Sequence, residues 1–169
     1  MNPTHDEIWR ARVHLAAANR LAVYDDLEEG IDNHFTMCVP DQKDRYLVLP
    51  FGLHWSEARA SDLIVFNEAG EVLEGSGSLE LSALSIHGVL VVGDNVAQAY
   101  RRLYKLERVC RAQILAMSTG RPLAVLDEAM VKRVETPNPR NSHSQAERET
   151  LYFAAMMRVL DREMPGYAD

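Results

Sequence analysis

The fold is decided by the stretch Leu63-Ile-Val-Phe-Asn-Glu-Ala-Gly-Glu-Val-Leu-Glu74, in which two short apolar runs flank a turn of hairpin length. Two earlier runs, His34 to Val39 and Tyr46 to Phe51, are separated by the turn residues Pro40 and Asp41. Strands joined by such short turns pair in antiparallel fashion with their neighbours. The sequence therefore predicts an antiparallel meander between residues 33 and 75.

Helices are predicted on both sides of this meander. Thr4 and Glu7 fit a capping box, and apolar residues at helical spacing continue to about Glu29, where Gly30 is a plausible stop. Gly93-Asp-Asn95 supplies a turn and a cap for the longest periodic segment, Val96 to Thr119. A last helix, Glu147 to Glu163, follows a linker from Pro137 to Ser142, and we expect it to dock on the body or on a neighbouring subunit.

Two apolar features are expected to be buried. The run Val89 to Val92 is short and continuous, which predicts a buried strand. The helix from Val96 to Thr119 carries an apolar stripe that includes Cys110, so this cysteine is expected in the core. The basic residues of the same helix are interpreted as a solvated face: they are Arg101, Arg102, Lys105, Arg108 and Arg111.

Composition narrows the class of protein. A chain of 169 residues with 47% hydrophobic and 25% charged residues is typical of a single globular domain. Its net charge of −7 argues against nucleic acid as the main partner. No secretory signal and no membrane-spanning apolar stretch are recognised, and Cys38 and Cys110 form no metal motif, so we expect a cytoplasmic protein.

Several segments share one order along the chain with a known family. They are Arg12 to Leu21, Gly30-Ile-Asp-Asn-His-Phe-Thr36, Pro50-Phe-Gly-Leu-His-Trp-Ser-Glu57, Ala60 to Leu63, Gly70 to Gly75, Glu80 to Ala99, Leu106 to Cys110 and Phe153 to Tyr167. Together they resemble the bacterial branch of the class II aldolase/adducin family. The resemblance implies a three-layer α/β/α sandwich on a mostly antiparallel sheet.

The resemblance also implies zinc chemistry. In the enzymes of the family, zinc is held by a His-x-His pair and a histidine of Asn-His-Gly, and a glutamate acts as acid/base. Here Glu80-Leu-Ser-Ala-Leu-Ser-Ile-His-Gly88 runs directly into Val89 with no such pair. The resemblance therefore implies an internal deletion, which can also remove central strands of the sheet.

Four residues are carried over to the family's site. His87 matches the histidine of Asn-His-Gly, although Ile86 replaces the asparagine, and it equally matches an upstream family histidine that binds no metal. Glu80 lies near the position of the catalytic glutamate, with an exposed loop carboxylate as its other interpretation. Asn33 and Thr36 match the loop that binds substrate, although Cys38 stands where an arginine is usual.

Three hypotheses follow. The first is a zinc-dependent lyase or aldolase of small hydroxy-carbonyl substrates, impaired here by the missing ligands. The second is a non-catalytic module, like the adducin head domain, for homo-oligomerisation or binding of an actin-type cytoskeletal partner. The third is a degraded or mispredicted gene product, whose missing centre would leave the sheet short of strands. We expect residues 1–135 to form the incomplete family domain and residues 136–169 a linker and a C-terminal helix.

Overall fold

The structure is a computed structural model that describes residues 4–32, 34–80, 89–136 and 143–169. Strands β1 (Thr36–Cys38), β2 (Tyr46–Val48), β3 (Ile64–Phe66) and β4 (Val72–Glu74) form one antiparallel sheet in the order β1-β2-β3-β4. The register pairs Met37 with Leu47 and Leu47 with Val65. The meander expected from the sequence is confirmed, and the α/β fold with it.

Helix α1 (His5–Tyr24) begins as the sequence predicts but ends earlier. Thr4 caps it, with the Glu7 carboxylate accepting from the Thr4 backbone N–H at 2.8 Å. The predicted end near Glu29 is wrong because Asp26 takes a left-handed conformation, with φ of 60°. The Leu27 N–H then donates to the Ala22 carbonyl at 2.8 Å, which closes the helix as a Schellman motif does.

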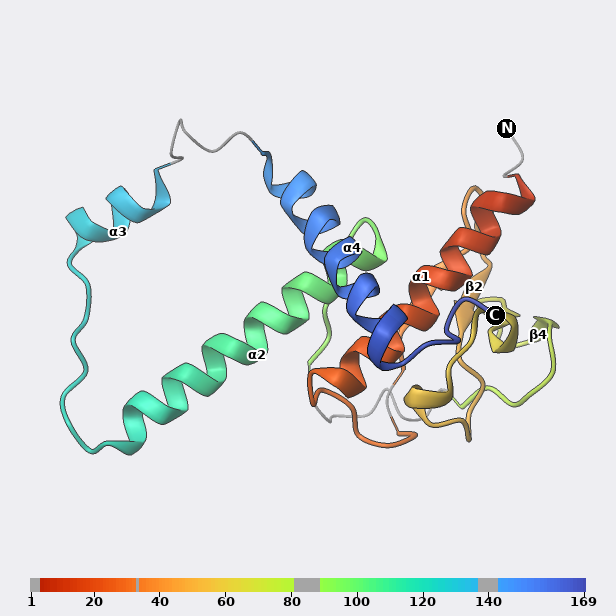
Figure 1. Cartoon of the computed structure of the whole chain (residues 1–169), viewed down its shortest axis with the longest axis horizontal. Helices are drawn as coiled ribbons and strands as arrows, with labels where there is room; N and C mark the ends of the chain where they lie inside the picture. Colours follow the sequence, from red (N-terminus) through yellow and green to blue (C-terminus); the bar gives the residue numbers. More distant parts are fainter. Residues whose placement is uncertain (1–3, 33, 81–88, 137–142) are drawn as a thin grey trace.

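The core lies between α1 and the sheet on one side and between α1 and two later helices on the other. These helices are α2 (Val96–Ser118) and α4 (Gln145–Glu163), which pack against each other and against α1. The alanine-rich face of α1 allows this close approach, and Leu15, Leu47 and Leu160 are fully buried in the same cluster. Figure 1 shows α4 lying across α1, with the strands on the far side of α1 from α4.

The predicted C-terminal helix is confirmed, and its observed start lies two residues before the predicted one. Ser144 caps α4 and Glu147 completes a capping box with the Ser144 backbone. Phe153 and Leu160 dock the helix on the body. The predicted linker from Pro137 to Ser142 lies outside the described residues.

Two burial predictions are wrong. Val89 to Val92 are not a buried strand: within residues 89–136 no strand is found, and the side chains of Val89, Leu90 and Val92 are exposed. Cys110 is exposed rather than in the core, because only the first turns of α2 pack on α1 and α4.

Beyond these turns the chain leaves the body. The outer part of α2 projects outward, and an unpredicted helix, α3 (Glu128–Glu135), lies at a distance from the body (Figure 1). Every side chain from Arg108 to Ala129 is exposed. None of the described helices is both long and apolar enough to cross a membrane.

Candidate functional site

The four site residues expected from the sequence fall into two groups. Glu80 and Thr36 are described, whereas Asn33 and His87 lie outside the described residues. Thr36 opens strand β1 opposite Val48. The roles of all four residues stay predictions.

Glu80 is placed by an isolated bridge after β4. The Phe51 N–H donates to the Ser78 carbonyl at 2.9 Å, which brings the chain after β4 alongside the end of β2. Gly77 permits this approach, because its φ of 141° and its missing side chain leave room for Pro50. The bridge therefore delivers Leu79 and Glu80 to the rim of a small cavity.

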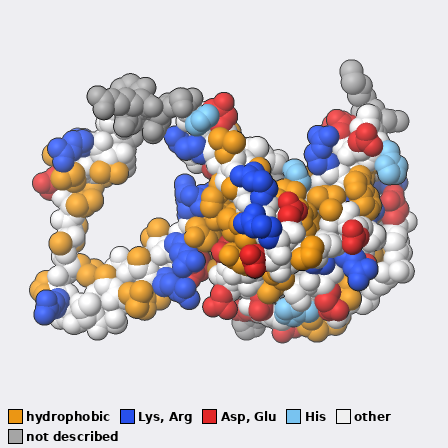
Figure 2. Space-filling view, in the orientation of Figure 1, with side chains coloured by type: hydrophobic (Ala, Val, Ile, Leu, Met, Phe, Trp, Pro, Cys, Tyr) orange, Lys and Arg blue, Asp and Glu red, His pale blue; other side chains and the backbone are white. Residues whose placement is uncertain are grey.

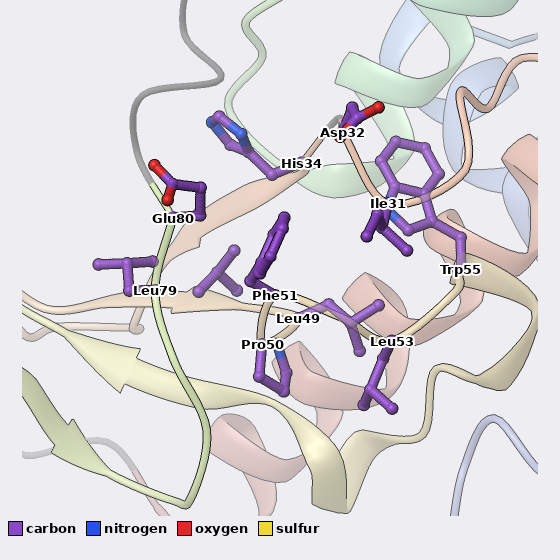
Figure 3. Close-up of a pocket in the computed structure, with 11 residues that line it drawn as sticks. Ile31, Asp32, His34, Leu49, Pro50, Phe51, Leu53, Trp55, Leu79 and Glu80 are labelled. Carbon is purple, nitrogen blue, oxygen red and sulfur yellow. The ribbon is translucent and has the colours of Figure 1, made fainter.

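That cavity is lined mostly by apolar side chains. Figure 3 shows His34 and Glu80 on the same side of it, above Phe51, with Leu49, Leu53 and Trp55 on the other. Burial lowers the pKa of His34, so its imidazole is held in the neutral form. The cavity measures about 20 Å³, which is room for roughly one water molecule.

Two other described histidines are engaged elsewhere. The Nδ1 atom of His54 lies 2.8 Å from the Ser56 hydroxyl and accepts from the Ser56 N–H, so His54 caps the short 3-10 helix Trp55–Glu57. His14 lies on α1 with its ring against Phe153, and burial lowers its pKa. These positions serve helix ends and packing.

A zinc site of the family type is not formed by the described residues. Among the described residues, no group of three or more His, Cys, Asp or Glu side chains is arranged to hold a metal ion. Three neutral imidazoles with an open position are what a catalytic zinc of this type needs. The described donor set does not fit the group.

A second, larger hollow was not foreseen. A groove of about 380 Å³ separates β1 from the segment Val89–Asn95 and reaches the first turns of α2. Its walls are largely apolar, and His34 and Thr36 line it too. The signal for it in the sequence was the apolar run Val89–Val92, which we interpreted as a strand. That segment is instead held by α2, since Arg102 donates to the Val92 carbonyl at 2.6 Å.

The four-stranded antiparallel meander packs under α1, with an acidic residue at a small cavity and an apolar groove beside the first strand. This arrangement defines an α/β protein rather than a repeat protein or a helical bundle. Comparison with known proteins gives the family. The sequence profile "Class II Aldolase and Adducin N-terminal domain" matches residues 13–87 and 77–114, and the chain belongs to this family.

The two matched ranges overlap at residues 77–87, so this short stretch is matched twice. Bacterial relatives support the same interpretation. An aldolase class 2 protein of Caulobacter vibrioides is 22% identical over 241 positions, covering 95% of this chain and 93% of the relative. Since this chain has only 169 residues, the relative carries residues that have no counterpart here. Both findings agree with an internal shortening near residues 77–87.

Solved structures share the fold. An aldolase II superfamily protein from Pseudomonas syringae has a TM-score of 0.79 at 20% identity, covering 99% of this chain and 98% of that one. L-fuculose 1-phosphate aldolase from Glaciozyma antarctica has a TM-score of 0.72 at 19% identity, with 97% of this chain and 96% of that one covered.

Adducins are also among the sequence relatives. Alpha-adducin from Rattus norvegicus is 39% identical over 69 residues, which is 40% of this chain and 9% of adducin.

Proposed function

We propose that this chain is a non-catalytic member of its family, which keeps the scaffold as an assembly and binding module and has lost the zinc centre. The observation that carries the proposal is the break at residues 77–87, where the family's His-x-His pair is missing from the sequence. The described residues offer no replacement cluster of metal ligands.

The cavity beside Glu80 supports the same conclusion. A general acid/base must reach the reacting atom of its substrate within hydrogen-bonding distance. The enclosed space beside Glu80 has room for roughly one water, so a hydroxy-carbonyl substrate of several carbon atoms would require the rim to open. Glu80 and His34 therefore serve the local structure of the rim in this proposal.

A second candidate is zinc-dependent aldol-type cleavage of a small hydroxy-carbonyl substrate. The likeness to L-fuculose 1-phosphate aldolase and the presence of Glu80 and His34 at one cavity favour it. In this candidate His87 is a zinc ligand, Glu80 moves the proton, and Asn33 and Thr36 bind the substrate. Zinc, when bound, supplies Lewis-acid stabilisation of the enediolate.

The likeness to adducins gives the module its candidate partners. Homo-oligomerisation and binding of an actin-type cytoskeletal partner both fit a scaffold without chemistry, and an actin-type partner would be met in the cytoplasm. The similarity to alpha-adducin covers only 69 residues, and it supports a shared scaffold.

Zinc content decides between the two candidates. Native mass spectrometry of purified protein, never exposed to chelators, reports zinc per subunit and the number of subunits together. We expect an oligomer without retained zinc and no cleavage of L-fuculose 1-phosphate. One tightly held zinc per chain, lost in His87→Ala and kept in the control His5→Ala, would establish the lyase candidate instead.

A further inference from the structure

The segment Leu106–Glu135, called the arm, holds ten of the twenty exposed large apolar residues of the described chain. It comprises the outer part of α2, an extended connection and α3. Figure 2 shows an opening between the arm and the rest of the molecule, with hydrophobic side chains along the arm. Exposed large apolar residues on the arm are Leu106, Val109, Ile114, Leu115, Met117, Leu123, Val125, Leu126, Val131 and Val134.

An arm of this kind is not expected to be stable in water by itself. A lone helix shorter than about 12 to 15 residues is marginal, and helices in proteins owe most of their stability to packing of an apolar face. The outer part of α2 and α3 have no such packing among the described elements. The exposed apolar face must therefore be covered by another surface.

The area of the chain indicates the size of that cover. A compact monomer of 19.1 kDa exposes about 8,400 Å². This chain exposes 11512 Å². The excess of about 3,000 Å² exceeds the roughly 800 Å² that each partner buries in a standard stable interface.

Charge favours a second copy of this chain as the partner. The arm contains five Lys and Arg and four Asp and Glu, a net charge of +1. Because the whole chain carries −7, the remaining residues carry −8. The opposite signs of these two net charges favour contact between the arm of one copy and the body of another.

The receiving surface is the groove beside Val89–Val92. Outside the arm, only Val89, Leu90 and Val92 exceed 55% exposure among the exposed large apolar residues of the described chain, and Leu90 reaches 88%. The acidic stretch Asp25-Asp-Leu-Glu-Glu-Gly-Ile-Asp32 precedes the residues 34–38 that line the groove. The groove thus offers apolar contact beside negative charge, which suits an apolar arm with a small net positive charge.

We infer that the arm of one copy packs against the groove beside Val89–Val92 on a second copy, and that this exchange of arms is what assembles the protein. The inference deepens the proposed assembly role and rests on it. Zinc content and oligomeric state are separate measurements, so the failure of one is distinguishable from the failure of the other.

The arm is tested with one variant that would place a charge inside the proposed contact. Val125, with 88% of its side chain exposed, lies in the extended connection of the arm. Size-exclusion chromatography with light scattering is expected to give an oligomer for the unchanged chain and 19.1 kDa monomers for Val125→Asp at the same concentration. We expect association at least 100-fold weaker. The matched control, Gln113→Glu, adds one negative charge at an exposed polar position of the arm and stays assembled.

The groove is tested by Leu90→Glu and by mixing. Leu90→Glu alone is also expected to be monomeric. A 1:1 mixture of the two variants is expected to form mixed oligomers. The Leu90→Glu chain still has an intact arm, and the Val125→Asp chain still has an intact groove to receive it. Circular dichroism checks that both variants are folded.

Three outcomes would overturn the inference. The first is an unchanged chain that stays monomeric at concentrations well above 10 μM. The second is a Leu90→Glu variant that stays assembled while Val125→Asp dissociates, which would indicate arm-to-arm contact. The third is two folded monomeric variants that do not associate when mixed.

Discussion

Arg20 ties the first helix to the C-terminal tail, and replacing it is expected to loosen both. Its guanidinium lies in the body, almost fully buried. The Nε atom donates to the Ala58 carbonyl at 2.7 Å, and Nη1 donates to the carbonyls of Met164 at 3.1 Å and Pro165 at 2.5 Å. Nη2 donates to the Glu57 carbonyl at 3.4 Å. One side chain thus satisfies four backbone acceptors from two distant segments.

The size of the effect follows from these bonds. A hydrogen bond from a charged donor contributes about 1.5 to 3 kcal/mol to stability, and leaving a buried acceptor without a partner costs about 1 to 3 kcal/mol. Burial works against the charged form, and it lowers the pKa of Arg20, with Arg59 adding to the effect. Arg20→Met keeps most of the volume and removes the bonds, so we expect a loss of about 3 to 5 kcal/mol.

Urea unfolding followed by circular dichroism measures this loss. With a slope of about 2 kcal/mol per molar, the midpoint is expected to fall by roughly 1.5 to 2.5 M. Arg10→Met on the exposed face of the same helix is the control and should change the free energy of unfolding by less than about 0.5 kcal/mol. Both are measured at one protein concentration, because assembly adds to stability. Equal midpoints for the two variants would refute the role of Arg20.

Two further predictions concern the backbone and pH. A methyl group on Gly77 would lie 2.5 Å from the Cβ of Pro50, so Gly77→Ala is expected to lower the free energy of unfolding by at least about 2 kcal/mol. The control is Gly30→Ala, where nothing lies within 4 Å and the expected loss is about 1 kcal/mol. Because burial lowers the pKa of His14, the unfolded chain binds more protons below about pH 6.5, and stability should fall from pH 7 to pH 5. Chemical unfolding should show a shallower pH dependence for His14→Gln, whereas His5→Gln keeps the original slope.

Local signals in the sequence predicted the elements well. Thr4 and Ser144 carry the side-chain oxygen that a helix start needs, and Asn95 accepts from the Gln98 N–H at 3.0 Å. The turns after Cys38 and Phe66 set hairpin lengths, so the order of strands followed from adjacency. The end of α1 was missed because aspartate rarely takes the left-handed conformation that Asp26 adopts.

Burial was the property that periodicity misjudged. Cys110 and Ile114 lie on an apolar stripe, and periodicity reports that a stripe exists without saying which surface covers it. The same holds for Val89 to Val92, whose apolar run would suit a central strand but has no strand beside it in residues 89–136. In both cases the covering surface is missing from the described chain, and we propose that a second copy provides it.

The sequence by itself determined the family, the antiparallel meander and the absence of a His-x-His pair, because motifs, turns and ligand types are local in the chain. Only the tertiary structure shows which residues far apart in the chain lie close together. It placed Glu80 at a cavity the size of a water molecule, assigned His54 to a helix cap, and left an apolar arm outside the body. Those outcomes depend on distances between residues far apart in the chain, which local patterns do not encode.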